Sequence, residues 1–341
     1  MLIPIQNIYY LLCYAWGKLP EREVVAVDPT DAATLPDLFA RVLVSGTKHL
    51  LRRGFDRGYV HRCELMSRLR GRVRFEDAVR TGLTLNSRLP CDCDELSYDI
   101  LHNQILKATM RQLLRSEGLG ANNSRELFQL CRLFSDVQDI EVTSRVFGQV
   151  QLYQNTRFYD FLLKVCELVH RNLLPTRNCG SGKFMDFVQD EAQMRVLFES
   201  FVRTFYRVHT DYRVKREDIH WKWIAADEIS ESLLPKMQTD ISLTSDTRKI
   251  IIDCKFTPQA TGRHYEAEKL RSSHLYQIHA YLNNLREGTL TDRCEIMLLY
   301  PTVDTPLCAS YSDRGRTVSI RTINLNQSWH GIHKDLLAIV N

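Results

Sequence analysis

The sequence predicts a mixed α/β chain of two domains, which we place at residues 1–155 and 156–341. A length of 341 residues exceeds the roughly 100–200 residues of one typical domain. The second half alternates helical and strand-like stretches, which is typical of a mixed sheet with helices packed against it. Hydrophobic residues make up 44% of the chain and charged residues 25%, values that exclude a disordered or collagen-like protein. No linker of distinctive composition marks the boundary.

The N-terminal part begins with an apolar segment of helical periodicity. Apolar residues recur at helical spacing from Ile5 to Trp16, and Gly17 can end the helix. We interpret this segment as a docking helix that packs on a core. Further helices are expected at residues 38–53, 98–116, 124–134 and 156–174.

Positive charge concentrates in one segment of the N-terminal part. Residues 41–80 contain eleven Lys or Arg and four acidic residues, an excess of seven, although the whole chain carries only +4. Basic residues alternate with others there, so one face of a strand would present Arg68, Arg70, Arg72 and Arg74. Such a face could bind phosphates or an acidic protein groove, or it could simply be solvated.

The C-terminal part begins with a helix and continues as a hairpin. An apolar stripe at helical spacing joins Met194, Leu197, Phe198, Phe201 and Phe205. Residues 237–243 alternate as a half-buried strand would, residues 245–247 form a turn, and residues 249–256 return as a second strand. A helix at residues 265–285 and an apolar strand at 296–300 complete the pattern.

Two carboxylates and a lysine meet on this hairpin. Asp253 and Lys255 are two positions apart on the return strand, so they point to the same face. The hairpin can bring Asp240 beside them. Charges next to three consecutive isoleucines are costly to bury unless something pairs them. A hard cation such as Mg²⁺ would do so, because it accepts one or two carboxylates together with water and phosphate oxygens.

The pattern D…(D/E)-x-K is the signature of PD-(D/E)xK nucleases, and the residues suit phosphodiester hydrolysis. Asp240 and Asp253 would hold the metal, with the carbonyl of Cys254 as a further ligand, and Lys255 would position the attacking water. Thr239 stands where the motif has its proline, whose side chain does no chemistry. Surface hairpins also carry such residues, so the motif alone is a weak signal.

The helix that follows the hairpin strengthens the nuclease interpretation. Gln277 and Tyr281 are four residues apart and share a face, as in the Q-x-x-x-Y helix of the RecB-like branch of these nucleases. Gln277 is expected in the catalytic set, and Tyr281 and Lys269, expected on the same helix, are candidate DNA contacts. The alternative is a Gln–Tyr pair that completes a core face. Glu199 could add a metal-site carboxylate, although a solvated helix glutamate is the simpler interpretation.

Several separated blocks, in order along the chain, resemble the McrC family of nuclease subunits from McrBC-type modification-dependent restriction systems. The blocks are IPIQNIYY at 3–10, YAWG at 14–17, GRV at 71–73, NTRFY at 155–159, LPKMQTD at 234–240, DCK at 253–255, LYQ at 275–277, YPTVDT at 300–305 and TINL at 322–325. The resemblance therefore extends over nearly the whole chain.

The resemblance implies a division of labour between the two parts. The N-terminal part would insert into the pore of a hexameric McrB-like AAA+ GTPase and stimulate GTP hydrolysis, and the C-terminal part would cut double-stranded DNA with Mg²⁺. GTP would be bound by the partner, because the sequence GSGK at 180–183 lacks most of a P-loop. The arginines of 68–74 would then face an acidic protein partner.

Composition predicts the cellular location of the protein, and three other functions compete with the nuclease interpretation. Ten cysteines without repeated spacing, no secretory signal and no apolar run longer than nine residues predict a cytoplasmic protein with free thiols and no membrane partner. Three other functions compete: a non-catalytic adaptor of the GTPase, a RecB-like exonuclease, and a nuclease of unmodified, sequence-defined sites. The first is disfavoured because the full catalytic set is present, and the second because the N-terminal blocks do not fit it.

Overall fold

The computed structural model describes residues 3–24, 34–68, 70–81, 88–153, 156–175, 182–257, 261–264, 267–285, 294–302 and 306–341. The chain forms two compact units. Unit 1 combines Met1–Leu19 with Asp186–Asn341, and unit 2 comprises Pro20–Met185. This division differs from the boundary expected after residue 155. The helix that follows residue 155 packs within unit 2, and the N-terminal helix belongs to unit 1.

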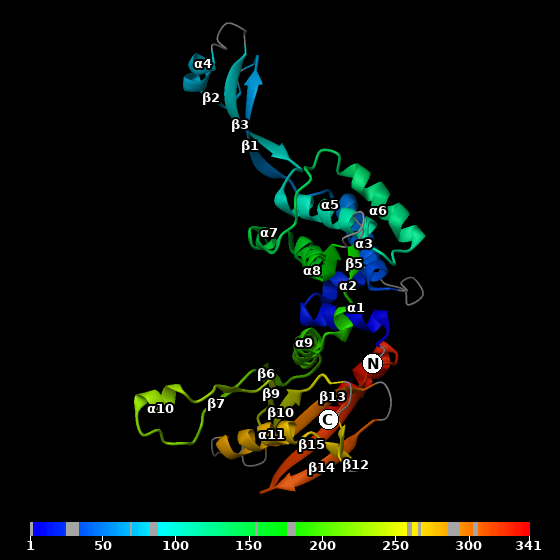
Figure 1. Cartoon of the computed structure of the whole chain (residues 1–341), viewed down its shortest axis with the longest axis vertical. Helices are drawn as coiled ribbons and strands as arrows, with labels where there is room; N and C mark the ends of the chain where they lie inside the picture. The colour runs from blue at the N-terminus through cyan, green and yellow to red at the C-terminus, as the bar shows by residue number, and fades with distance from the viewer. Residues whose placement is uncertain are drawn as a thin grey trace. The chain divides into compact units, whose positions relative to one another are not determined.

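A six-stranded mixed sheet forms the centre of unit 1 (Figure 1). Its strand order is β14-β15-β13-β10-β9-β6. β10 pairs with β13 in parallel, and β13 pairs with β15 in parallel, whereas the other neighbours are antiparallel. The strands are β6 (Arg213–Lys215), β9 (Ile241–Thr244), β10 (Lys249–Cys254), β13 (Glu295–Thr302), β14 (Cys308–Asp313) and β15 (Arg316–Asn324). The expected mixed α/β fold class is confirmed.

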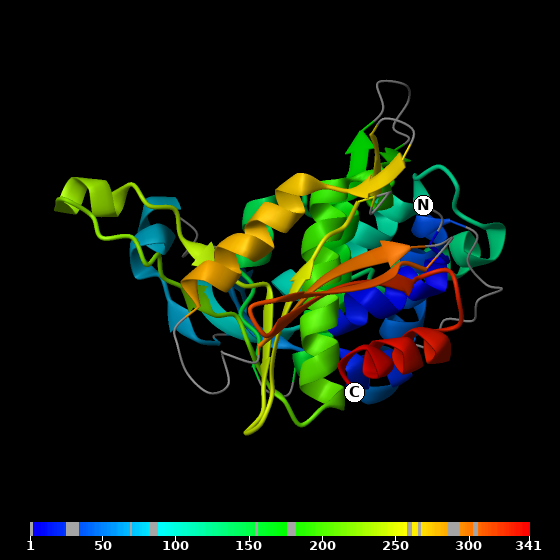
Figure 2. The same cartoon turned by 90° about the horizontal axis from the view of Figure 1, so that it is seen from below.

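Four long helices of unit 1 pack on this sheet or on one another. α11 (Ser272–Asn284) makes the crossover between the parallel strands β10 and β13 and packs on Ile251, Ile296 and Leu298. The other three helices are α1 (Ile5–Ala15), α9 (Glu191–His209) and α12 (Trp329–Val340). In Figure 2, α11 (gold) and α12 (red) lie on opposite sides of the orange strands. A buried apolar layer on each face therefore holds the strands that carry the expected site.

The N-terminal segment is a docking helix, as its sequence predicts. In α1 nearly every residue from Asn7 to Tyr14 is buried. The ring of Tyr14 lies 5.6 Å from that of Phe201 on α9 and 5.1 Å from that of Trp329 on α12. Because these apolar faces cover one another, α1 completes the core of unit 1, although unit 2 separates it from that core in the sequence.

Unit 1 also contains short elements outside the main sheet, and one of them changes the expected start of a helix. β7 (Asp218–Ile219) pairs with β8 (Met237–Gln238), and α10 (Glu228–Ser232) lies between them in the sequence. A 3₁₀ turn, Phe187–Gln189, precedes α9. β11 (Thr261–His264) pairs with β12 (Ala267–Leu270), so the helix expected from residue 265 begins only at Ser272. The hairpin uses backbone groups that an earlier helix start would have required.

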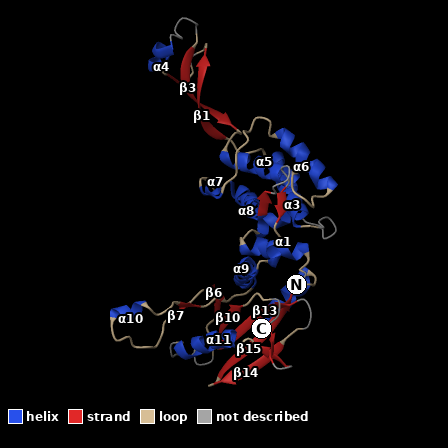
Figure 3. Cartoon of the chain, in the orientation of Figure 1, coloured by secondary structure: helices blue, strands red, loops and turns tan. Residues whose placement is uncertain are grey.

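Unit 2 is built mainly from helices (Figure 3). Its long helices are α3 (Leu35–Arg53), α5 (Leu101–Leu114), α6 (Ala121–Leu133) and α8 (Arg157–Asn172), all close to the expected ranges. The shorter elements are α2 (Leu19–Val24), α7 (Ser144–Gly148), β4 (Leu173–Pro175) and β5 (Gly182–Phe184). Thr34 caps α3 by accepting a hydrogen bond from the amide of Asp37. Within the described ranges, no helix has both the length and the apolar character needed to cross a membrane.

A long hairpin extends from the helices of unit 2 (Figure 1). It consists of β1 (Gly58–Met66), β2 (Arg72–Val73), α4 (Phe75–Thr81) and β3 (Leu89–Ser97). The four-arginine strand face expected at residues 68–74 is wrong, because of the residues described in this range only Arg72 and Val73 are in a strand. Gly71 turns the chain there with φ +70°, and a Cβ on it would lie 2.1 Å from the carbonyl oxygen of Asp92. All four arginines are nevertheless exposed.

Candidate active site

Asp240 lies at a bend where the hairpin passes from one sheet to another. β8 pairs with β7 outside the main sheet, whereas β9 pairs with β10 inside it. Ile241 is opposite Ile252 in that ladder, so Asp240 comes next to the residues that follow Ile252. Its Oδ2 accepts a hydrogen bond of 2.9 Å from the amide of Cys254. The hairpin therefore brings Asp240 and Asp253 together, as the sequence predicts.

Asp253, Lys255 and Gln277 form a continuous polar chain on the α11 face of β10. Asp253 is fully buried, and its Oδ2 lies 2.8 Å from Nζ of Lys255. Lys255 Nζ donates to Oε1 of Gln277 at 2.7 Å. The two-residue period of the strand and the helix crossover that follows it place these three side chains together. The four expected catalytic residues are thus neighbours.

Tyr281 connects this chain to the other strand of the hairpin. Gln277 Nε2 donates to the Tyr281 hydroxyl at 2.8 Å, and that hydroxyl donates to the carbonyl of Gln238 at 3.0 Å. Tyr281 is only 2% exposed, so the side chain offers little surface for the expected contact with DNA, which stays a prediction. Its position instead fixes the rotamer of Gln277. Tyr281 lies on the face of α11 that packs on the sheet, and this packing buries its side chain.

Lys269 does not lie on the helix where the sequence placed it. It belongs to β12, opposite Gly262, and precedes the first residue of α11. Its side chain is outside the part of the chain that the structure describes. The DNA contact expected at Lys269 was argued from a position on the helix with Gln277, and the structure does not place Lys269 on that helix.

Glu199 is not the solvated glutamate that its place on α9 favoured. Its side chain is 14% exposed and lies 2.7 Å from both Arg203 and Arg216. Nη1 of Arg203 also donates to the carbonyl of Asp240 at 3.4 Å. The stripe of apolar residues gave no sign of this, because the partner Arg216 is on a different segment. Glu199 thus forms one side of the carboxylate cluster.

The three carboxylates make the site costly to ionise. Burial, followed by the charges of Asp253 and Glu199, raises the pKa of Asp240 to about 7. Burial also raises the pKa of Asp253, and Lys255 opposes this shift. Oδ2 of Asp253 faces the Lys255 ammonium, but Oδ1 is buried without a hydrogen-bond donor of good geometry among the described residues. Buried carboxylate oxygens without donors are suitable ligands for a hard cation.

The donor set fits Mg²⁺ better than a metal that requires many side-chain ligands. Among the described residues, no three His, Cys, Asp or Glu side chains are grouped to hold a metal ion. Mg²⁺ needs only one or two carboxylates and completes its shell with water and substrate oxygens. Asp240, Asp253 and the carbonyl of Cys254 could supply the protein ligands. Zinc, which is usually held by three or four Cys, His or carboxylate side chains, does not fit this set.

A second network holds the backbone on both sides of Asp240, and its centre is Glu217. Glu217 and Thr239 exchange two hydrogen bonds of 2.9 Å, one from the amide of Thr239 to the Glu217 carbonyl and one from the amide of Glu217 to Thr239 Oγ1. The Ser242 hydroxyl donates to Glu217 Oε2 at 3.0 Å. Thr239 and Ser242 flank Asp240, so Glu217 fixes the bend that presents it.

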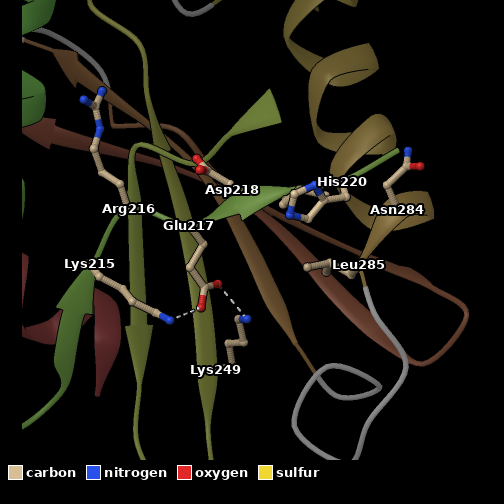
Figure 4. Close-up of a pocket in the computed structure, with 9 residues that line it drawn as sticks. Lys215, Arg216, Glu217, Asp218, His220, Lys249, Asn284 and Leu285 are labelled. Carbon is tan, nitrogen blue, oxygen red and sulfur yellow. Dashed lines mark ion pairs between the residues drawn. The ribbon is translucent and has the colours of Figure 1, made fainter. Parts of the chain in front are cut away.

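Two lysines complete the network around Glu217. Figure 4 shows Lys215 and Lys249 directed at the two oxygens of its carboxylate, at 2.9 Å and 2.7 Å respectively. Burial alone would raise the pKa of Glu217, but the hydrogen bonds and charges of Lys249 and Lys215 outweigh it and lower the pKa. Sequence reasoning missed Glu217, because its role depends on contacts with Thr239 and Lys249, which are more than 20 residues away in the sequence. No local pattern reveals such contacts.

Comparison with known proteins gives matches along nearly the whole chain. The model of a family described as "McrBC 5-methylcytosine restriction system component" matches residues 6–301. The type IV methyl-directed restriction enzyme EcoKMcrBC of Escherichia coli K12 is 32% identical over 339 residues, which cover 99% of this chain and 97% of that protein. One chain from an assembly of Thermococcus gammatolerans McrB AAA+ hexamers with bound McrC matches with a TM-score of 0.62. That match has 18% identity and covers 98% of this chain and 76% of the other, so it supports the fold alone.

Proposed function

This chain belongs to the family of McrBC 5-methylcytosine restriction system components, and we propose that it is the subunit that cuts DNA. One observation carries the proposal. Asp240, Asp253, Lys255 and Gln277 come from a hairpin and a crossover helix and form one polar cluster, in which Oδ1 of the buried Asp253 has no hydrogen-bond donor among the described residues. A structural salt bridge alone would not require two further acidic groups in the same place.

The proposed chemistry is hydrolysis of a phosphodiester bond. Mg²⁺, held by Asp240, Asp253 and the carbonyl of Cys254, would polarise the phosphate and lower the pKa of the attacking water. Lys255 directs one N–H to Gln277 Oε1 and lies against Asp253, so its remaining N–H groups can orient the water and offset negative charge that develops on the phosphate. Gln277, held by Tyr281, keeps the ammonium in this orientation. The products would carry 5′-phosphate ends.

The proposal includes a partner, a hexameric McrB-like AAA+ GTPase that binds and hydrolyses GTP. In the solved structure with the same fold, McrC is bound to McrB AAA+ hexamers. Unit 2 presents a suitable surface, because its hairpin exposes Tyr59, Phe75 and Val79 at 78%, 68% and 74%. Exposed apolar side chains of this size are typical of protein interfaces. The exposed arginines at 68, 70, 72 and 74 lie on the same hairpin and would contact acidic groups of the partner.

Cleavage of DNA in the presence of Mg²⁺ and GTP tests the proposal. We expect wild type to cut only with the AAA+ partner, and Asp253→Asn to abolish cutting while it still stimulates GTP hydrolysis in the same tubes. Asp246→Asn, in the exposed turn of the same hairpin, is the matched control and should cut like wild type. If wild type stimulates GTP hydrolysis without cutting, the chain is an adaptor and the proposal is wrong.

A further inference from the structure

A cationic pocket between α5 and α6 of unit 2 lies outside everything described so far. Its volume is about 410 Å³. Lys107, Arg111 and Arg115 line it from α5 at four-residue intervals, and Phe128 and Arg132, four residues apart, line it from α6. Pockets that take small ligands are commonly about 300–1,000 Å³. The volume therefore suits a single nucleotide-sized group.

The pocket has more positive charge than its carboxylates neutralise. Lys107 Nζ donates to the carbonyl of Val137 at 2.6 Å and lies 3.1 Å from Asp139, which also pairs with Arg111. Asp139 is thus shared by two cations. Arg115 and Arg132 are exposed, and no carboxylate of a described residue pairs with either of them. Even if Asp136, next to the lining residue Ser135, is counted with Asp139, four cations face two anions. An anion would relieve this repulsion.

An exposed aromatic ring stands among these cations. Phe128 is 58% exposed although it lines a pocket, whereas its neighbours Leu127 and Leu130 on the same helix are buried. Guanidinium groups bind phosphate by paired hydrogen bonds, and an exposed ring offers a face on which a base can stack. An acidic peptide would use the arginines and leave the ring unused.

We propose that this pocket binds a nucleoside phosphate, with the phosphate on Arg115 and Arg132 and the base against Phe128. The ligand could come from an unpaired position of the DNA strand or from a free guanine nucleotide, because both present the same chemistry. The choice of these two sources rests on the proposed function. The positive charge of the pocket and the exposure of Phe128 are independent of that function. Binding can also be measured without cleavage, so a failure of either proposal is distinguishable from a failure of the other.

The first measurement is the affinity of the full-length protein for a labelled single-stranded oligonucleotide, in EDTA to prevent cleavage. Replacing both Arg115 and Arg132 with Ala should weaken binding about tenfold or more, since a hydrogen bond to a charged group contributes roughly 1.5–3 kcal/mol. The slope of log affinity against log salt concentration should also become shallower by about 0.7, for the loss of one phosphate contact. Arg125→Ala, on the same helix outside the pocket, is the matched control, and the double Arg→Lys variant should recover part of the affinity.

The second measurement reports on the pocket itself. Cys131 lines the pocket, and Cys308 is exposed in unit 1, so alkylation of both thiols can be followed by mass spectrometry in one sample. We expect a bound oligonucleotide to slow modification of Cys131 but not of Cys308, and the Arg115/Arg132 double variant to lose this protection. Phe128→Leu should lose protection by single strands while it keeps its helical circular dichroism.

Each outcome decides the inference. Protection of Cys131 by the oligonucleotide but not by GDP supports the DNA strand as the source, and protection by GDP supports the free nucleotide. Protection only by the AAA+ partner, with neither nucleic acid nor GDP effective, would overturn the proposal and identify an acidic protein contact. Unchanged affinity and unchanged Cys131 modification in the double variant would overturn it as well.

Discussion

At the scale of single residues, Glu217 illustrates how a side chain can support a site without touching its reacting atoms. Its backbone and carboxylate hold Thr239 and Ser242, the neighbours of Asp240. Three of its contacts depend on the carboxylate, namely those with Lys215, Lys249 and Ser242. A small displacement of Asp240 would disturb any cation that it shares with Asp253.

Glu217→Gln should therefore slow cleavage while the protein stays folded. We expect the single-turnover rate to fall about tenfold, since one or two charge-assisted bonds contribute roughly 1–3 kcal/mol, and the Mg²⁺ concentration at half-maximal rate to rise. DNA affinity should not change. Glu228→Gln, exposed on α10, is the control. An unchanged Mg²⁺ dependence would show that Glu217 has only a structural role.

The same carboxylate predicts a change of stability with pH. The pKa of Glu217 is lower in the folded protein than its ordinary value of 4.5, so the folded state favours the ionised form. Its contribution to the free energy of unfolding is complete above pH 4.5 and is lost as the pH falls through the lower folded pKa. Urea unfolding of wild type and Glu217→Gln from pH 6 to pH 3 should show the difference between them shrink. A difference that stays constant would contradict the assignment.

Sequence reasoning found residues whose roles depend on local periodicity and missed those that depend on pairing between distant segments. Asp253 and Lys255 follow from the two-residue repeat of a strand, and Gln277 follows from its four-residue spacing to Tyr281, which matches the Q-x-x-x-Y helix of related nucleases. Glu217 and the arginine pairs of Glu199 depend on where separate bends and strands meet. Tyr281 was assigned to DNA because the four-residue spacing identifies a shared face but does not tell whether that face is covered.

At the scale of secondary structure, the hairpin of unit 2 shows why a residue pattern alone did not give the local fold. Arginines alternate from 68 to 74, yet Gly71 interrupts the strand because its positive φ and its contact with the Asp92 carbonyl require a turn. Arg74 then pairs with Asp77 at 2.9 Å in the first turn of α4. The arginines consequently lie around a turn, where several can reach one partner.

Replacing Arg70, Arg72 and Arg74 with Ala should reduce stimulation of the partner's GTP hydrolysis more than it reduces DNA affinity. These side chains are exposed, so the free energy of unfolding should change little. Arg207→Ala, exposed on α9 in the other unit, is the control for loss of positive charge. Titration of GTP hydrolysis against increasing amounts of each variant measures the effect. Loss of DNA binding with normal stimulation would assign the arginines to DNA instead.

At the scale of the whole molecule, the helix α8 explains why the unit boundary falls after residue 185. Tyr159 on α8 donates to Asn103 at 2.9 Å and accepts from the amide of Asp56 at 3.1 Å, and its ring packs edge-on against His102. Both α5 and the loop after α3 are thus held by one residue of α8. The sequence could not place the boundary, because α8 has the same composition and periodicity as a helix of either unit.

A fragment of residues 20–185 should therefore fold alone, whereas a fragment of residues 20–155 should not. The shorter fragment exposes the apolar faces of α3 and α5 that α8 covers, and we expect it to aggregate. Circular dichroism and urea unfolding of the two fragments test this, with Tyr159→Phe in the longer one as a milder variant that loses about 1 kcal/mol. Cooperative unfolding of the shorter fragment would restore the earlier boundary.

The packing of α1 on α9 has a consequence for the newborn protein on the ribosome. α1 emerges before unit 2, but its apolar surface is covered only after residues 186–341 have been made, whereas unit 2 is complete by residue 185. Because translation proceeds at about 5–20 residues per second and units fold as they emerge, unit 2 should mature many seconds before the strands that hold Asp240 and Asp253 exist. A nascent chain would then acquire its cutting site only after the module proposed to control it is already in place.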